Sequence, residues 1–224
     1  FLRELHEALS DYETTFVVVN DCSTDATAEV MAELAEGGFP VMFQTNARNS
    51  GHGPSTMSAL RAALASQAEI VVATDGDGQF FGSDVRRLVE VVASGSIDVC
   101  EGVRTSRTDP AYRKVTTATT RWLVWCRVRE IPEDANTPLR VYRRSVLPSL
   151  IDAVPEGAMT PNLFMSMLAR KRGLRIDEVR VRSIPRRGAE AIGTTWGRGS
   201  RLPSRRFLRF CTKATREWFT TTVA

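Results

Sequence analysis

Apolar and polar residues follow one another along this 224-residue chain in blocks of two kinds. Short apolar or β-branched runs, bounded by polar and glycine-containing segments, are typical of strands buried on both faces. Longer blocks place apolar residues three or four positions apart, and Leu2, Leu5 and Leu9 form the first such helical face. Because strands and helices alternate, we predict an α/β fold with a central, mostly parallel sheet flanked by helices.

The predicted elements follow from these blocks and from the turn residues between them. Strands are expected at residues 15–19, 40–44, 70–74, 97–103, 139–144 and 174–182. Helices are expected at residues 1–12, 26–35, 54–65, 84–93, 114–129, 162–172 and 203–219. Thr24 or Asp25 is expected to cap the second helix, and Ser83 the fourth.

An apolar stripe runs along the predicted helix at 114–129. Val115, Ala118, Trp122 and Trp125 recur at three- or four-residue steps. We expect this stripe to face the protein core, and a cofactor-binding face is the alternative.

Length and composition favour one domain. No repeat or Pro/Gly/Ser-rich linker divides the chain, and no apolar run approaches the roughly 20 residues of a membrane-spanning helix. Four widely spaced cysteines and two histidines provide no zinc-binding set, and free thiols are typical of the cytoplasm. We therefore expect a cytoplasmic protein, either soluble or peripheral at the inner face of the membrane.

Positive charge is concentrated near the C-terminus. Residues 180–216 hold 11 of the 30 Lys and Arg residues and a single acid, Glu190. The remaining chain carries 19 basic and 25 acidic residues. This asymmetry indicates an anionic partner for the C-terminal part: phosphate groups, an anionic membrane surface or nucleic acid.

A loop rich in oxygen ligands follows the predicted strand at 70–74. Asp75, Asp77 and Gln79 alternate, so an extended loop would point their side chains the same way. Such a set suits a divalent metal, Mg²⁺ or Mn²⁺, whose shell water and a diphosphate would complete. A calcium-binding EF-hand loop is rejected, because it would need Gly and Glu where this chain has Phe80 and Arg86. Ordinary turn acids remain the alternative.

Four segments, in this order, resemble those of family 2 glycosyltransferases: VVVNDCSTDAT (17–27), ATDGDGQF (73–80), EGVRTSR (101–107) and DANTPLRVYRR (134–144). The similarity is greatest to the dolichyl- and polyprenyl-phosphate sugar transferases. It implies a GT-A fold and an inverting, metal-dependent enzyme that moves a sugar from a UDP- or GDP-sugar to a polyprenyl phosphate or a glycan. It implies no nucleic-acid partner.

The resemblance also assigns residues to the nucleotide-sugar donor. Asp21 matches an acid that contacts the base or ribose, with a turn-capping role as the alternative. Asp75 and Asp77 match the family's metal-binding aspartates, and Gln79 matches the glutamine that follows them. Together these three would hold the metal on the diphosphate, with Asp77 counted as catalytic.

The segment NSGHGPS (49–55) resembles the family's glycine loop before a helix. Gly51 and Gly53 would let the backbone approach the donor, next to a helix N-terminus that favours negative charge. A plain tight turn is the alternative.

Asp134 and Arg140 match an acidic and a basic residue near the acceptor and are the other two expected catalytic residues. A phosphate acceptor is already ionised, whereas a sugar hydroxyl would need Asp134 as general base. Structural salt bridges are the alternative for both. Further arginines are expected to bind the acceptor or phosphate groups: Arg104, Arg113, Arg186 and Arg187.

Residues 203–224 are expected to form a basic amphipathic helix that follows a glycosyltransferase domain at 1–202. Phe207, Phe210, Ala214 and Trp218 recur at helical steps. This helix would either lie in an anionic membrane interface or dock on the protein's own core.

In relatives, a first strand and a nucleotide-binding loop precede the helix with which this sequence opens. The sequence is therefore either a fragment or that of a shorter protein, and in the shorter protein we expect an unfilled position in the sheet and weakened nucleotide binding. Two other functions stay open: a non-catalytic nucleotide- or membrane-binding module with a degenerate transferase fold, and a sugar nucleotidyltransferase, which the segment at 134–144 disfavours.

Overall fold

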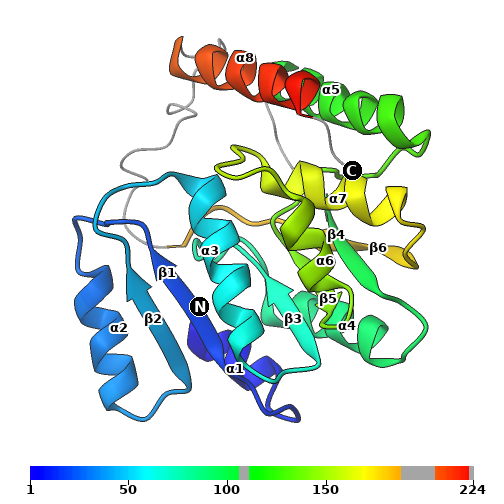
Figure 1. The fold of residues 1–224 in the computed structure, drawn as a ribbon. Helices are drawn as coiled ribbons and strands as arrows, with labels where there is room; N and C mark the ends of the chain where they lie inside the picture. Colours follow the sequence, from blue (N-terminus) through cyan, green and yellow to red (C-terminus); the bar gives the residue numbers. More distant parts are fainter. Residues whose placement is uncertain (106–110, 188–204, 222–224) are drawn as a thin grey trace.

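The computed structural model describes residues 1–105, 111–187 and 205–221, which form two β-sheets with helices around them (Figure 1). The smaller sheet pairs β1 (Phe16–Asn20) in parallel with β2 (Val41–Thr45). The larger sheet has the order β3-β5-β4-β6, with β3 at Ile70–Ala73, β4 at Val99–Thr105, β5 at Arg140–Arg143 and β6 at Ile176–Arg182. The predicted α/β fold class is confirmed.

The helices of the described residues are α1 (Leu2–Ala8), α2 (Thr27–Glu36), α3 (His52–Ala65), α4 (Gly82–Ala93), α5 (Ala111–Val128), α6 (Leu147–Ala153), α7 (Pro161–Lys171) and α8 (Arg205–Thr220). Some of them cover the two faces of the larger sheet, whereas α2 packs against β2 of the smaller sheet and α5 against α7. Neighbouring residues of β5 belong to different cores: Val141 packs with residues of α1 and α4, and Tyr142 with residues of α3, α6 and α7. Since successive strand residues point to opposite faces, one core lies on each side of the sheet.

The larger sheet is mixed, because β5 runs antiparallel to both β3 and β4, whereas β4 and β6 are parallel. If β5 were parallel to β4, the connection between these two strands would have to cross over the sheet. The connecting helix α5 instead packs against α7.

A break separates the two sheets. Among the described residues, β1 pairs only with β2, and β3 pairs only with β5 on the other side. Helix α3 contacts both β1 and β3 and so joins the sheets through side chains.

Helix α4 begins differently from the prediction. Ser83 is not its cap, because the helix starts at Gly82 and Phe81 occupies the N-cap position without a side-chain hydrogen bond. The Glu4 carboxylate of α1 accepts a hydrogen bond from the Gly82 amide at 2.9 Å. A residue distant in sequence thus takes the place of the local cap. Helix α6 was not predicted, since its seven residues are too few to show a helical period.

The apolar stripe of α5 is the clearest correction. Val115 is 65% exposed and Trp122 is 54% exposed, so this stripe does not face the core as predicted. The core instead receives Leu123 and Val124, which are buried on another side of the helix. Periodicity identifies residues that share a face but not what covers that face.

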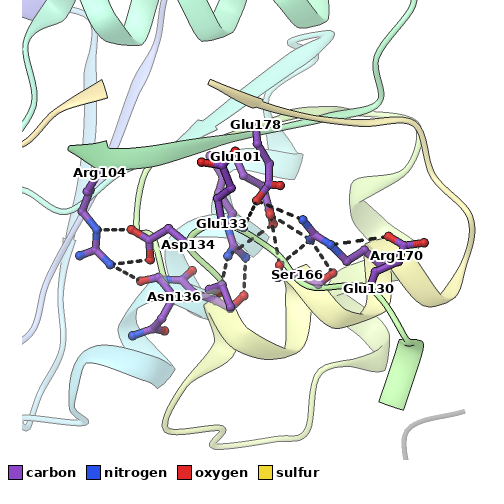
Figure 2. A network of polar contacts seen from close by, with 12 residues as sticks. Glu101, Arg104, Glu130, Glu133, Asp134, Asn136, Ser166, Arg170 and Glu178 are labelled. Carbon is purple, nitrogen blue, oxygen red and sulfur yellow. Dashed lines mark hydrogen bonds and ion pairs between the residues drawn. The ribbon is translucent and has the colours of Figure 1, made fainter. Parts of the chain in front are cut away.

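A buried ion network links β4, β5 and α7 (Figure 2). Glu101 lies between two buried arginines: its Oε2 accepts from Arg170 Nη1 at 2.9 Å, and its Oε1 lies 3.4 Å from Arg140 Nη2. Ser166 donates to the same carboxylate at 3.2 Å, and Arg170 also reaches Glu178 at 3.3 Å. Two guanidinium charges are therefore buried against one central carboxylate.

Removal of the Glu101 charge should strongly destabilise the fold. In Glu101→Gln, Arg140 and Arg170 would keep their buried charges without this counter-ion, so the free energy of unfolding is expected to fall by about 3–5 kcal/mol. Urea unfolding followed by circular dichroism measures the change. Glu90→Gln, which removes an exposed partner of Arg86, is the matched control and should leave the unfolding midpoint nearly unchanged. Equal midpoints for the two variants would contradict the account.

Candidate active site

Three loops that follow strands or precede α3 supply the predicted donor residues. Asp21 directly follows β1, Asp75 and Asp77 follow β3, and Gly51 is the N-cap of α3. The carboxyl ends of parallel strands and the amide end of the following helix are where α/β folds bind phosphate-containing ligands.

Asp21 holds the glycine loop in place. Its Oδ1 accepts from the Ser50 amide at 2.8 Å and from Asn46 Nδ2 at 2.9 Å, and its Oδ2 accepts from the Gly51 amide at 2.8 Å. Partial burial acts to raise the pKa of Asp21, but these hydrogen bonds outweigh it and hold the pKa below its usual range. Asp21 is thus an ionised anchor for the segment in front of α3.

The two predicted loop glycines are required for different reasons. Gly51 has φ +90°, a conformation that other residues rarely adopt. A Cβ at position 53 would lie 2.0 Å from the carbonyl oxygen of Ala158. The close approach that Gly53 permits is therefore to the protein's own backbone.

Asp75 and Asp77 lie in the loop after β3 and face cationic or protonatable groups. His52 Nδ1 lies 3.8 Å from Asp75 Oδ1, and Arg186 Nε lies 3.1 Å from Asp77 Oδ2. Burial and the neighbouring Asp75 charge raise the pKa of Asp77, while Arg186 opposes this shift. The two carboxylates repel each other, so a cation placed between them would be stabilised.

This chemistry fits a divalent metal that the protein ligates only in part. Within residues 1–105, 111–187 and 205–221, no three acidic, His or Cys side chains gather into a ligand set. Two carboxylates and the Gln79 amide leave most positions around a hard cation to water and phosphate oxygens. Asp75, Asp77 and Gln79 are thus suited to a metal that arrives with a diphosphate.

The segment that leaves β6 lies against this loop. Gln79 Nε2 donates to the Ile184 carbonyl at 3.2 Å, and the Arg187 amide donates to the Asp77 carbonyl at 3.0 Å. The Arg187 guanidinium pairs with Glu4 and lies over the Phe81 ring, 5.4 Å from its centroid. The structure therefore brings the predicted Arg186 and Arg187 to the predicted metal loop.

Arg104 and Asp134 are paired with each other. Arg104 Nε donates to Asp134 Oδ2 at 2.7 Å, and Nη2 donates to Oδ1 at 2.9 Å, in the forked arrangement shown in Figure 2. The same Nη2 also donates to the Asn136 carbonyl at 3.2 Å. Both side chains are largely buried. The predicted phosphate-binding arginine and the predicted base thus form one bidentate unit.

The remaining two predicted arginines differ in what the structure describes. The Arg140 side chain is fully buried and donates to the Asn162 and Ala135 carbonyls, which places it inside the ion network rather than on a surface. Arg113 belongs to the first turn of α5, and its side chain lies outside the described part of the chain.

Three residues of the site were missed by the prediction from sequence. Asn46 binds Asp21 and follows directly after β2, so the topology signal used for the other loops could have identified it. His52 belongs to the glycine loop and lies beside Asp75, but no role was predicted for it. Glu4 pairs with Arg187 across 183 positions of sequence, for which no local pattern gives a signal.

Several curated relatives with significant similarity are named as undecaprenyl-phosphate sugar transferases. The chain is 27% identical over 156 residues to an undecaprenyl-phosphate 4-deoxy-4-formamido-L-arabinose transferase from Pectobacterium carotovorum, covering 69% of this chain and 46% of that protein. A protein of the same name from Pseudomonas fluorescens is 28% identical over 153 residues, covering 68% of this chain and 44% of the relative. The chain thus spans about half the length of these relatives.

Solved structures share the fold. A glucosyl-3-phosphoglycerate synthase from Mycobacterium tuberculosis in complex with phosphoglyceric acid aligns with a TM-score of 0.58 at 18% identity, over 84% of this chain and 68% of that one. A mannosyltransferase from Pyrobaculum calidifontis, solved with GDP-mannose and Mn²⁺, aligns with a TM-score of 0.55 at 21% identity, over 84% and 55% of the two chains. Both likenesses support the GT-A architecture predicted from the sequence.

The family model for glycosyl transferase family 2 matches residues 1–150. This range contains β1 to β5, the Asp21 anchor, the Asp75–Asp77 loop and the Arg104–Asp134 pair. The match covers well over half of the chain and agrees with both the relatives and the fold. The chain belongs to glycosyl transferase family 2.

Proposed function

We propose that this protein is an inverting glycosyltransferase that moves a sugar from a UDP- or GDP-sugar to a polyprenyl phosphate. The observation that carries the proposal is the pair of close carboxylates, Asp75 and Asp77, at the end of β3. Ionisation of Asp77 beside a second carboxylate destabilises the folded protein, as the raised pKa of Asp77 indicates, and a bound divalent cation would offset this cost. The names of the curated relatives support the choice of acceptor.

On the donor side, each loop has a distinct task. Asp75, Asp77 and Gln79 would hold the metal, which supplies Lewis-acid stabilisation of the departing nucleoside diphosphate. Asp21 fixes the Gly51 loop at the start of α3, where the helix N-terminus would favour the negative charge of the donor diphosphate. Arg186, already at Asp77, would add a second positive charge next to the diphosphate.

On the acceptor side, we propose that the Arg104–Asp134 unit orients the phosphate and that Arg140 acts only by positioning β5 under it. A phosphate is already ionised when it attacks the sugar, so Asp134 would not have to act as a general base. A glycan hydroxyl would change this, and it remains the second candidate acceptor.

A lipid acceptor also implies a location. We propose that the protein works at the cytoplasmic face of a membrane, in contact with an anionic surface. In the part of the chain that the structure describes, no helix has the length and apolar content to cross a bilayer.

Metal-dependent nucleotide binding tests the donor site. At nucleotide concentrations about 100 times the Kd, UDP or GDP with Mn²⁺ should raise the Tm by about 5–10 °C. Asp77→Asn should abolish this increase. The unliganded variant should melt no lower than the wild type at neutral pH, because the raised pKa means that ionisation of Asp77 costs stability as the pH rises through that pKa.

Asp152→Asn, a change at an exposed acid of α6, is the matched control and should keep the full increase. Calorimetric titration on the same three proteins gives the affinities and identifies the base. An Asp77→Asn variant that binds nucleotide and Mn²⁺ like the wild type would overturn the proposal. Failure of the wild type to bind either nucleotide would favour a non-catalytic module.

The acceptor class is tested by Asp134→Asn. With undecaprenyl phosphate as acceptor, transfer from the donor that the titration identifies should fall by less than about tenfold, because no general base is lost. The assay measures radiolabelled sugar extracted into organic solvent. A loss of about 10²–10⁴-fold, the range for a missing general base, would contradict the phosphate acceptor and favour a hydroxyl.

A further inference from the structure

Helices α5 and α8 lie side by side at one end of the molecule (Figure 1) and expose large apolar side chains. On α5, Val115 and Trp122 are seven residues apart and share the exposed stripe described above. On α8, Leu208 is 51% exposed and Phe219 is 61% exposed. Their spacing of 11 residues also places them on one helical face, so each helix carries an apolar row toward solvent.

This row on α8 is not the side by which the helix is attached to the protein. Trp218 is buried and packs on Phe164 of α7, with ring centroids 5.1 Å apart. Arg127 of α5 donates to the Trp218 carbonyl and lies 4.7 Å from the centre of its ring. Phe207, in the first turn of α8, is buried as well. The helix is therefore anchored by one face and presents the other.

The presented face of α8 is cationic. Its charged residues that lie exposed are all basic: Arg205, Arg209, Lys213 and Arg216. The one acid of the helix, Glu217, is turned inward and accepts from the Met159 amide at 3.1 Å. An anion that approaches this side of α8 therefore meets four positive charges beside the apolar row.

We propose that the exposed rows of α5 and α8, together with these four cations, form a surface that binds an anionic lipid bilayer. Apolar side chains of a helix lying in the membrane plane enter the headgroup region, and neighbouring Lys and Arg side chains bind anionic headgroups. An apolar row alone would suit a second protein equally, but the row of cations with no exposed acid favours lipid. The choice of partner rests on the proposed lipid-linked acceptor.

Contacts through the 158–159 loop connect this surface to the donor site. Glu217 of α8 holds the Met159 amide, and the preceding Ala158 carbonyl packs against Gly53 at the start of α3. Gly51, the N-cap residue of α3, donates its amide hydrogen to Asp21. A bilayer bound through α8 would thus lie at the end of the molecule where the donor loop is held.

Vesicle co-sedimentation of the full chain, without nucleotide, tests the proposal. The wild type should bind vesicles of phosphatidylcholine containing about a quarter phosphatidylglycerol much more tightly than vesicles of phosphatidylcholine alone. Leu208→Ser with Phe219→Ser should weaken the partition coefficient by about tenfold. Arg209→Ala with Lys213→Ala should weaken it by about 25-fold, since each cation near an anionic surface contributes about fivefold.

The controls carry matched changes elsewhere on the surface. Met42→Ser removes an equally exposed apolar side chain from β2, and Arg61→Ala with Arg172→Ala removes two exposed cations. Both should bind vesicles like the wild type, and all variants should keep the wild-type Tm. Equal weakening by test and control variants, or tight binding to phosphatidylcholine alone, would overturn the proposal.

Two further outcomes would also overturn it. One is a wild type that does not bind vesicles but forms a concentration-dependent dimer in sedimentation velocity, with the dimer lost in the Leu208→Ser, Phe219→Ser variant. The other is absence of vesicle binding in a protein that binds nucleotide with Mn²⁺, which would leave the proposed sugar transfer standing but not its location at an anionic membrane. A protein that binds vesicles but neither nucleotide would support the proposed membrane-binding surface and contradict the proposed transferase function.

Discussion

One carboxylate, Glu101, determines how the larger sheet meets the helix that covers it. Arg140 of β5 and Arg170 of α7 bring two positive charges into the interior, and Glu101 of β4 lies between them. Without this partner, the buried charge of either arginine would strongly destabilise the folded protein. Three residues further along β4, Arg104 clasps Asp134 from the loop before β5. Arg104, which pairs with Asp134, therefore lies on the same strand as Glu101, the centre of the ion network that joins the sheet to α7.

The acids of the candidate site divide by what surrounds them. Hydrogen bonds from the Ser50 and Gly51 amides lower the pKa of Asp21, so its charge is satisfied by the protein and stabilises a loop. Burial beside Asp75 raises the pKa of Asp77, whose charge Arg186 satisfies only in part. A carboxylate whose charge is satisfied by hydrogen bonds, like that of Asp21, stabilises the loops of the site. A carboxylate with a raised pKa, like that of Asp77, would be stabilised by an added cation. This difference is the physical basis for assigning metal binding to the loop after β3.

Local patterns predicted the strands, most helices and the loops that carry Asp21, Asp75 and Asp77, because burial and turn chemistry act over a few residues. They could not predict the partners of these side chains. Arg104 and Asp134 matched separate family segments and were assigned to ligands, yet they bind each other across 30 positions. The stripe with Val115 and Trp122 has the helical period that was predicted, but it is exposed, since a solvent-facing row and a core-facing row have the same spacing.

The central claim is that the protein completes a metal site only together with a nucleotide diphosphate. Electron paramagnetic resonance of free Mn²⁺ counts the ions bound per chain, with and without UDP or GDP. The account predicts weak binding to the protein alone and one tightly bound ion per chain with the matching nucleotide, lost when Asp75 and Asp77 are both changed to Asn. An ion count that the nucleotide does not alter, or that survives both substitutions, would contradict it.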